Sequence, residues 1–195
     1  MEYINDYSAD FVFISETWLV EGCNIVSAYF KSMGYHLYAK NRELRRGGGV
    51  AILCKSKYNL QEITYDSYVS FEYCCHSFLH CSGKKLILIS LYRPPNTNIN
   101  QFFEEFTKLL EFLITKNGSI IIAGDINIHL DLDNNITSSF LDILSTFNML
   151  NHINTPTHCL GHALDTIISS VDLKLFNIDC NDVKLSDNSL INFYL

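Results

Sequence analysis

The stretch SIIIAGDINIH at residues 119–129 decides how we interpret the whole sequence. Its three consecutive isoleucines predict a buried strand, and Gly124 marks the end of that strand. Asp125 and Asn127 follow with their side chains on the same side, where a carboxylate and an amide can orient a water and hold a phosphate oxygen. Ordinary turns use the same residue types, so this stretch alone leaves a purely structural role equally open.

Further polar residues stand where an apolar segment ends or a turn begins. Glu16 follows one such segment and is a candidate Mg²⁺ ligand, because magnesium binds oxygen atoms and often only one or two carboxylates. Tyr92 and Arg93 precede two prolines, and they offer a hydrogen-bond donor and a fixed positive charge suited to phosphate. Asp165 and Asp187 are acids at similar places, and each also fits an ordinary capping or turn role.

Apolar segments typical of strands recur along the chain, and two other segments have helical periodicity. We predict helices over about residues 102–113 and from about Thr137, with Thr137 as the N-cap of the second. Because no linker, repeat or low-complexity block interrupts residues 1–195, the sequence predicts one domain of a layered α/β or α+β class. The predicted strands are residues 11–15, 35–39, 49–54, 72–79, 86–91, 119–123, 164–169 and 190–194.

The composition excludes several classes of protein. With 48% hydrophobic and 18% charged residues, the chain has too many apolar residues to be intrinsically disordered. Its longest apolar runs are about four residues, whereas a membrane-spanning helix needs about 20, so we expect no membrane insertion. The net charge of −7 argues against tight non-specific binding of nucleic acid, although the acids named above contribute part of that charge.

The seven cysteines are an odd number and form no CxxC motif, which indicates reduced thiols of an intracellular protein. The cluster Cys74, Cys75, His76, His80 and Cys81 does contain residue types that bind zinc. A strand over residues 72–79 would direct Cys74 and Cys75 to opposite faces, whereas a structural zinc needs four ligands that converge. We therefore favour buried thiols over a zinc site at this cluster.

The order of Glu16, Tyr92, Asp125, Asp165 and Asp187 along the chain resembles that of the endonuclease/exonuclease/phosphatase family of metal-dependent phosphodiesterases. Four stretches are most similar to the endonuclease domain of non-LTR retrotransposons, namely residues 15–19, 46–51, 92–96 and 157–165. The resemblance extends from about residue 10 to residue 195. It implies a four-layer sandwich, in which two mixed β-sheets pack face to face with helices outside.

The resemblance also implies a role for each matching residue. Glu16 would hold Mg²⁺, with Mn²⁺ as an alternative ion, and Asp187 would assist the metal or water network. Asp125 would orient or deprotonate the attacking water, while Asn127 and Tyr92 would contact the scissile phosphate. The reaction would be in-line hydrolysis of a phosphodiester, with the metal neutralising the developing charge.

One position departs from the family pattern. Asp165 would orient a catalytic histidine directly after the Ser-Asp pair, but Asn188 stands at that place. An amide donates a hydrogen bond yet supplies neither a transferable proton nor a positive charge, and loss of an acid–base group costs about 10²–10⁴-fold in rate. His129, His158 and His162 are potential substitutes that the sequence alone does not place at the site.

By the same resemblance, the expected partner is DNA, and the protein would be a monomer in the nucleus. Arg93, Arg45 and Arg46 are candidate contacts to DNA phosphates, although Arg45 and Arg46 also fit a solvated loop. The sequence starts where the family's first helix would end, so the first strand of the fold is expected to be missing. Two alternatives remain open: a catalytically inactive relic or binding module of the same fold, and a phosphatase acting on a phosphorylated lipid or inositol.

Overall fold

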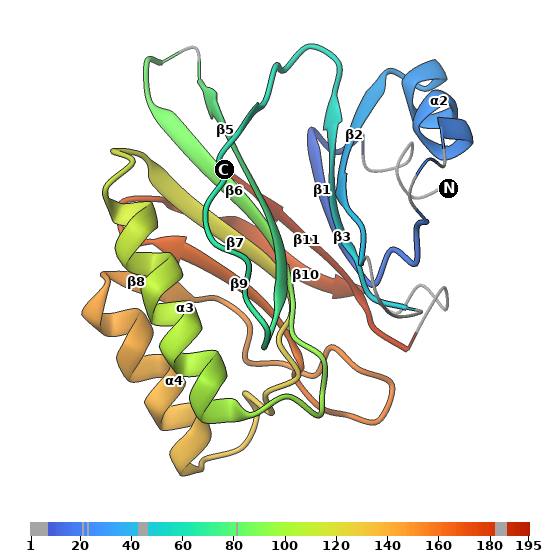
Figure 1. The fold of residues 1–195 in the computed structure, drawn as a ribbon. Coiled ribbons are helices and arrows are strands. Elements are labelled where there is room, and N and C mark those ends of the chain that lie inside the picture. The colour runs from blue at the N-terminus through green and yellow to red at the C-terminus, as the bar shows by residue number, and fades with distance from the viewer. Residues whose placement is uncertain (1–7, 21, 23, 43–46, 81, 182–186) are drawn as a thin grey trace.

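The protein is described by a computed structural model that covers residues 8–20, 22, 24–42, 47–80, 82–181 and 187–195. This part of the chain is an α/β fold with three helices and three sheets (Figure 1). The elements are β1 (Phe11–Ser15), α2 (Asn24–Ser32), β2 (Tyr35–Lys40), β3 (Val50–Lys55), β4 (Gln61–Glu62), β5 (Glu72–Leu79), β6 (Lys85–Tyr92), α3 (Ile99–Ile114), β7 (Ser119–Asp125), α4 (Asn135–Thr146), β8 (Met149–Asn151), β9 (Asp165–Ser170), β10 (Phe176–Asn181) and β11 (Leu190–Tyr194).

The largest sheet is mixed and has the strand order β4-β5-β6-β7-β9-β8. The pair β6–β7 is parallel and the other pairs are antiparallel. Strands β5, β6 and β7 confirm the predictions for residues 72–79, 86–91 and 119–123, and most of their residues are buried on both faces of the sheet. The smaller sheets are β1-β3-β2 and β10-β11.

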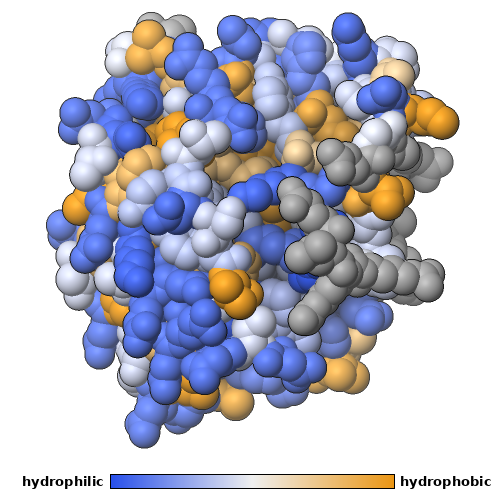
Figure 2. Space-filling view, viewed as in Figure 1, coloured by the Kyte–Doolittle hydropathy of each residue, from blue (hydrophilic) through white to orange (hydrophobic). Residues whose placement is uncertain are grey.

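Both faces of the large sheet are covered. Helices α3 and α4 pack on one face, where Phe102, Phe106 and Phe140 join the sheet residues in one apolar core (Figure 1). Strand β3 packs on the other face through Val50 and Ile52, and α2 covers the outer side of the three-stranded sheet. The outward sides of α3 and α4 are mainly hydrophilic, as amphipathic helices require (Figure 2).

The start of α4 differs from the prediction. Asn134 is the N-cap, and its Oδ1 accepts hydrogen bonds from the backbone N–H groups of Ile136 and Thr137. The predicted cap, Thr137, lies inside the first turn and donates its hydroxyl to the carbonyl oxygen of His129 at 3.0 Å. The prediction was therefore wrong at this residue, because Asn134 offers the same cap one turn earlier.

The cysteines of β5 lie as the buried-thiol interpretation expects. Cys74 packs in the core toward β3, and Cys75 packs in the core under α3. Burial raises the pKa of each thiol to about 12, so both are protonated at neutral pH. The predicted cluster member Cys81 lies outside the described residues. No helix in the described ranges is long and apolar enough to cross a membrane.

Candidate active site

The predicted polar residues meet because the strands that carry them end at one edge of the molecule. Tyr92 is the last residue of β6 and pairs in register with Asp125, the last residue of β7. Asp125 pairs in turn with Asp165, the first residue of the antiparallel strand β9. Tyr92, Asp125 and Asp165 therefore stand side by side across three neighbouring strands.

Gly124 makes this arrangement possible. Its φ is +148°, and a Cβ atom built on it would lie 1.9 Å from the carbonyl oxygen of Leu91 on β6. No side chain fits in that space, so only glycine lets β7 approach β6 closely directly before Asp125. The Gly-Asp order in the sequence is therefore a packing requirement as well as a chemical signal.

Glu16 joins the group from the end of β1. Its φ of +53° is left-handed, and the next two backbone N–H groups donate to the carbonyls of Gly49 (3.1 Å) and Gly48 (2.9 Å). These bonds fix the backbone that carries Glu16. The Glu16 carboxylate accepts hydrogen bonds from the Tyr92 hydroxyl and from Trp18 Nε1, the latter at 3.4 Å. Burial and the Glu16 bond both raise the pKa of the Tyr92 phenol, so the hydroxyl remains a neutral donor.

The buried carboxylates of Asp125 and Asp165 lie side by side on neighbouring strands, and Asp125 is next to Tyr92. Asp125 Oδ1 accepts a hydrogen bond from the Asn127 backbone N–H at 2.9 Å. Asn188 Nδ2 donates to Asp125 Oδ2 at 3.4 Å and to Asp165 Oδ1 at 3.2 Å, so the amide bridges the two acids. In the described part of the chain, Asp165 Oδ2 has no hydrogen-bond partner.

The Asp125 and Asp165 carboxylates are buried, so little water screens the repulsion between their charges. Burial raises the pKa of the Asp125 carboxyl to about 6, and nearby Glu16 adds to the rise, while the bonds from Asn127 and Asn188 oppose it. Burial, followed by the charge of Asp125, raises the pKa of Asp165 to about 7. Two neighbouring carboxylates with raised pKa values mark a place where a bound cation or a proton would relieve their repulsion.

The Arg93 side chain is held by backbone carbonyls. Its guanidinium donates to the carbonyl oxygens of Ile126 (3.1 Å), Asn127 (3.0 Å) and Thr97 (2.8 Å) and stacks over the ring of Phe102. Arg93 is 4% exposed and does not line the cavity beside Asp125, and its contacts hold the loop after β7.

Asn127 is part of the same local structure. It has a left-handed φ of +48°, and its Nδ2 donates to the Arg93 carbonyl at 2.8 Å. The two residues therefore exchange bonds in both directions and lock the loop that presents Asp125. Asn127 still lines the cavity, as a phosphate contact requires.

Asp187 and Asn188 stand directly before β11 and contact the loop that precedes β9. The carbonyl of Asp187 accepts from the Cys159 N–H at 2.8 Å, and Asn188 forms a β-bridge with His158. Asp187 is exposed at the cavity. The predicted DNA contacts Arg45 and Arg46 lie outside the described residues.

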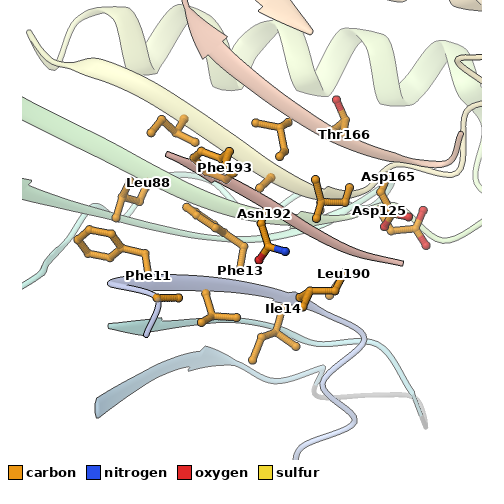
Figure 3. A pocket seen from close by; sticks show the side chains of 18 of the residues that line it. Phe11, Phe13, Ile14, Leu88, Asp125, Asp165, Thr166, Leu190, Asn192 and Phe193 are labelled. Carbon is orange, nitrogen blue, oxygen red and sulfur yellow. The ribbon is translucent and has the colours of Figure 1, made fainter. Parts of the chain in front are cut away.

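A cavity of about 1370 Å³ connects these residues to the interior. It runs between β1 and the large sheet beside β11, where Phe11, Phe13 and Phe193 line an apolar part, and Asp125 and Asp165 stand at its other end (Figure 3). The residues at the polar end are Glu16, Trp18, Tyr92, Asp125, Asn127, His158, Asp165, Asp187 and Asn188.

Sequence reasoning did not place His158 at the site, and it left Trp18 open as a core residue or a residue of the site wall. His158 enters through its bridge to Asn188, a long-range pairing that no local pattern shows. Trp18 enters through its bond to Glu16, and 57% of its surface is exposed, which distinguishes it from an ordinary core tryptophan. The sequence signal for Trp18 was its position two residues after Glu16, the acid at the end of a predicted strand.

Known proteins share both the sequence pattern and the fold. A model of the endonuclease/exonuclease/phosphatase family matches residues 1–187. The endonuclease domain of TRAS1, a telomere-specific non-LTR retrotransposon, is 14% identical with a TM-score of 0.75, over 97% of this chain and 87% of that one. A comparison with curated proteins gave no match.

Two further solved structures have the same fold. The 3′ phosphatase NExo from Neisseria, bound to a product DNA hairpin, is 16% identical with a TM-score of 0.77, over 96% of this chain and 89% of that one. An AP endonuclease from Archaeoglobus fulgidus is 16% identical with a TM-score of 0.66, over the same shares. With a family model that spans nearly all of it, and a fold that agrees, this chain belongs to the endonuclease/exonuclease/phosphatase family.

Proposed function

We propose that this protein is a metal-dependent phosphodiesterase that cleaves DNA, derived from a non-LTR retrotransposon and weakened by Asn188. The observation that carries the proposal is the register of Tyr92, Asp125 and Asp165 across three strands, with Glu16 completing the group from β1. DNA is the substrate we favour because the TRAS1 domain is an endonuclease and the Neisseria neighbour is bound to a DNA product. We further propose a monomer in the nucleus and the family's four-layer sandwich.

The donor atoms present suit Mg²⁺, with Mn²⁺ as an alternative. They are oxygen atoms of Glu16 and Asp187, which would hold the ion, close to the buried pair Asp125 and Asp165. The raised pKa values of that pair and the unpartnered Asp165 Oδ2 support a cation at this end of the cavity. When bound, such an ion supplies charge stabilisation to the phosphate during in-line displacement.

The protein's own groups would prepare the attacking water. Asp125 is fixed by the Asn127 N–H and by Asn188, so its carboxylate holds one orientation. A pKa of about 6 leaves it mostly ionised at neutral pH yet basic enough to accept a proton from water. The neutral Tyr92 hydroxyl would remain a hydrogen-bond donor beside the phosphate.

Asn188 is where we propose that catalysis is impaired. Its Nδ2 group is already directed at two carboxylates, and an amide cannot transfer a proton to the leaving oxygen. We therefore expect hydrolysis to be slower by about 10²–10⁴-fold than with an acid–base group at this position. The presence of Asn188 at this position also favours a second candidate function, in which a module of this fold binds DNA without cleaving it.

The test compares wild type with Asn188→His on supercoiled DNA and on phosphorylated lipid and inositol substrates, all with Mg²⁺. We expect weak nicking by the wild type, a gain of about 10²-fold or more in the variant, and no release of phosphate from the lipid or inositol substrates. DNA binding without nicking by either protein would favour the inactive module. Phosphate release from the lipid or inositol substrate alone would overturn the proposed substrate class.

A further inference from the structure

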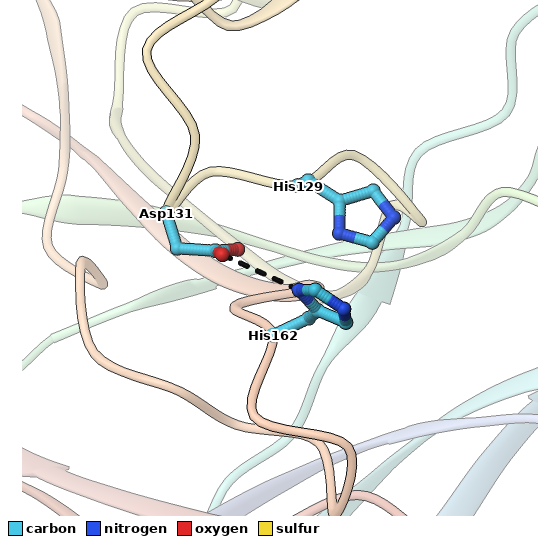
Figure 4. Close-up of side chains that lie close together, drawn as sticks. All are labelled: His129, Asp131 and His162. Carbon is cyan, nitrogen blue, oxygen red and sulfur yellow. Dashed lines mark hydrogen bonds and ion pairs between the residues drawn. The ribbon is translucent and has the colours of Figure 1, made fainter.

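A second group of potential metal ligands lies outside the cavity. His129 and Asp131 belong to the loop after β7, and His162 belongs to the loop before β9 (Figure 4). One ligand atom from each of the three side chains lies within 4.8 Å of the others. The group contains two imidazoles and one carboxylate, a donor set distinct from the all-oxygen set beside Asp125.

The three side chains are held by the backbone around them. Asp131 Oδ1 accepts from the Ala163 N–H at 2.9 Å, which leaves Oδ2 directed at His162 Nδ1, 3.3 Å away. The Leu130 N–H donates to the Ala163 carbonyl at 3.0 Å, and Thr137 donates to the His129 carbonyl. The loops that carry the ligands are therefore already joined and anchored to α4.

His129 adds an independent sign of a missing partner. Its Nδ1 is buried and has no hydrogen-bond partner among the described residues. The ring packs edge-on against His162, with ring centroids 4.3 Å apart and an interplanar angle of 88°. A buried ring nitrogen without a hydrogen-bond partner, next to an Asp–His pair, is available to bind an ion.

The distances suit a tetrahedral ion. Zinc binds imidazole nitrogen and carboxylate oxygen at about 2.0–2.2 Å, which places neighbouring ligand atoms of a tetrahedron about 3.3 Å apart. Asp131 and His162 already have this separation, and His129 would reach it with a side-chain shift of about 1.5 Å or less. Asp131 would also retain its bond to the Ala163 N–H, a support typical of ligating carboxylates.

We propose that His129, Asp131 and His162, with a water molecule as the fourth ligand, form a Zn²⁺ site that fastens the two loops of the active site to each other. His129 lies four residues after Asp125, and His162 lies three residues before Asp165. A bound ion thus restrains both buried carboxylates from outside the cavity. Magnesium is a poor occupant here, because it prefers oxygen ligands, whereas imidazole suits Zn²⁺.

Calorimetric titration of the full chain with Zn²⁺, in excess Mg²⁺ and without DNA, tests the site independently of any nuclease activity. We expect one Zn²⁺ per chain, and His129→Gln and His162→Gln are each expected to weaken binding by about 100-fold, since even outer-shell changes cost about 10–100-fold. His36→Gln in β2 is the matched control and leaves the affinity unchanged. Asp125→Asn also leaves it unchanged, because that residue belongs to the other site.

Hydrogen exchange of the wild type gives a second readout that needs no variant. Zn²⁺ is expected to slow amide exchange in residues 126–132 and 157–164 more than elsewhere. The proposal would be overturned if the wild type bound no Zn²⁺. It would also be overturned if both histidine variants bound Zn²⁺ as tightly as the wild type. So would Zn²⁺ binding that disappears in Asp125→Asn and persists in His162→Gln, which would assign the ion to the carboxylates instead.

Discussion

Asp165→Asn is expected to stabilise the fold at pH 8 while it removes a residue of the proposed catalytic site. In the folded protein the pKa of Asp165 is about 7, because burial and the charge of Asp125 penalise its ionised form, against 3.8 for an unperturbed aspartate. Each pKa unit corresponds to about 1.4 kcal/mol, so ionising this carboxyl costs the folded state about 4 kcal/mol.

The sign of the pH dependence follows from proton binding. Between about pH 4 and pH 7 the folded protein retains the Asp165 proton and the unfolded chain does not, so stability falls as pH rises through this range. Above about pH 7 both states are ionised and the loss is complete. An asparagine has no charge to bury and keeps an acceptor for Asn188, so we expect a gain of about 2–4 kcal/mol at pH 8 and little change near pH 4.

Thermal unfolding at several pH values measures this effect. For a domain of this size, each kcal/mol shifts the midpoint by about 2–4 °C. Asp142→Asn, at an exposed position of α4, is the matched control and should leave the midpoint unchanged at every pH. Added Mg²⁺ should narrow the difference between wild type and Asp165→Asn at pH 8. A variant that is less stable than wild type at pH 8, or a difference that does not depend on pH, would refute the reasoning.

Two predictions concern the packing that supports the site. Arg93→Gln should lower the free energy of unfolding by about 2–4 kcal/mol in urea titrations, because it removes charged hydrogen bonds to buried carbonyls. An unchanged unfolding midpoint would contradict this anchoring role of Arg93. Gly124→Ala should lose more than about 4 kcal/mol or fail to fold, because its Cβ would overlap the Leu91 carbonyl. Gly83→Ala, in an open turn, is the comparison and should cost about 1 kcal/mol, and equal losses in the two variants would contradict the steric argument.

The centre of the large sheet could be predicted from the sequence because its signals are local. The runs in β6 and β7 are apolar on both faces, and the spacing of Phe102 and Phe106 in α3 is helical, so each element is specified by its own residues. Helix α2 was missed because it is short and buries only Phe30 fully. The weak strands β4, β8 and β10 depend on their partners rather than on a pattern of their own.

The candidate site shows the same division between local and long-range information. Glu16, Asp125 and Asp165 stand at strand ends, which the sequence reveals directly. The bridge from Asn188 to the two acids joins residues 63 and 23 positions apart, and only the fold shows it. The charge of Arg93 is visible in the sequence, whereas its three carbonyl acceptors are shown only by the fold.

The central claim is that Asp125 acts in hydrolysis of a DNA phosphodiester bond that depends on a divalent metal. Nicking of supercoiled DNA by wild type, Asp125→Ala and Asn188→His, with Mg²⁺ and with chelator, tests it most directly. We predict slow Mg²⁺-dependent nicking by the wild type, none above background in Asp125→Ala, and faster nicking in Asn188→His. Nicking that persists unchanged in Asp125→Ala, or in the presence of chelator, would contradict the claim.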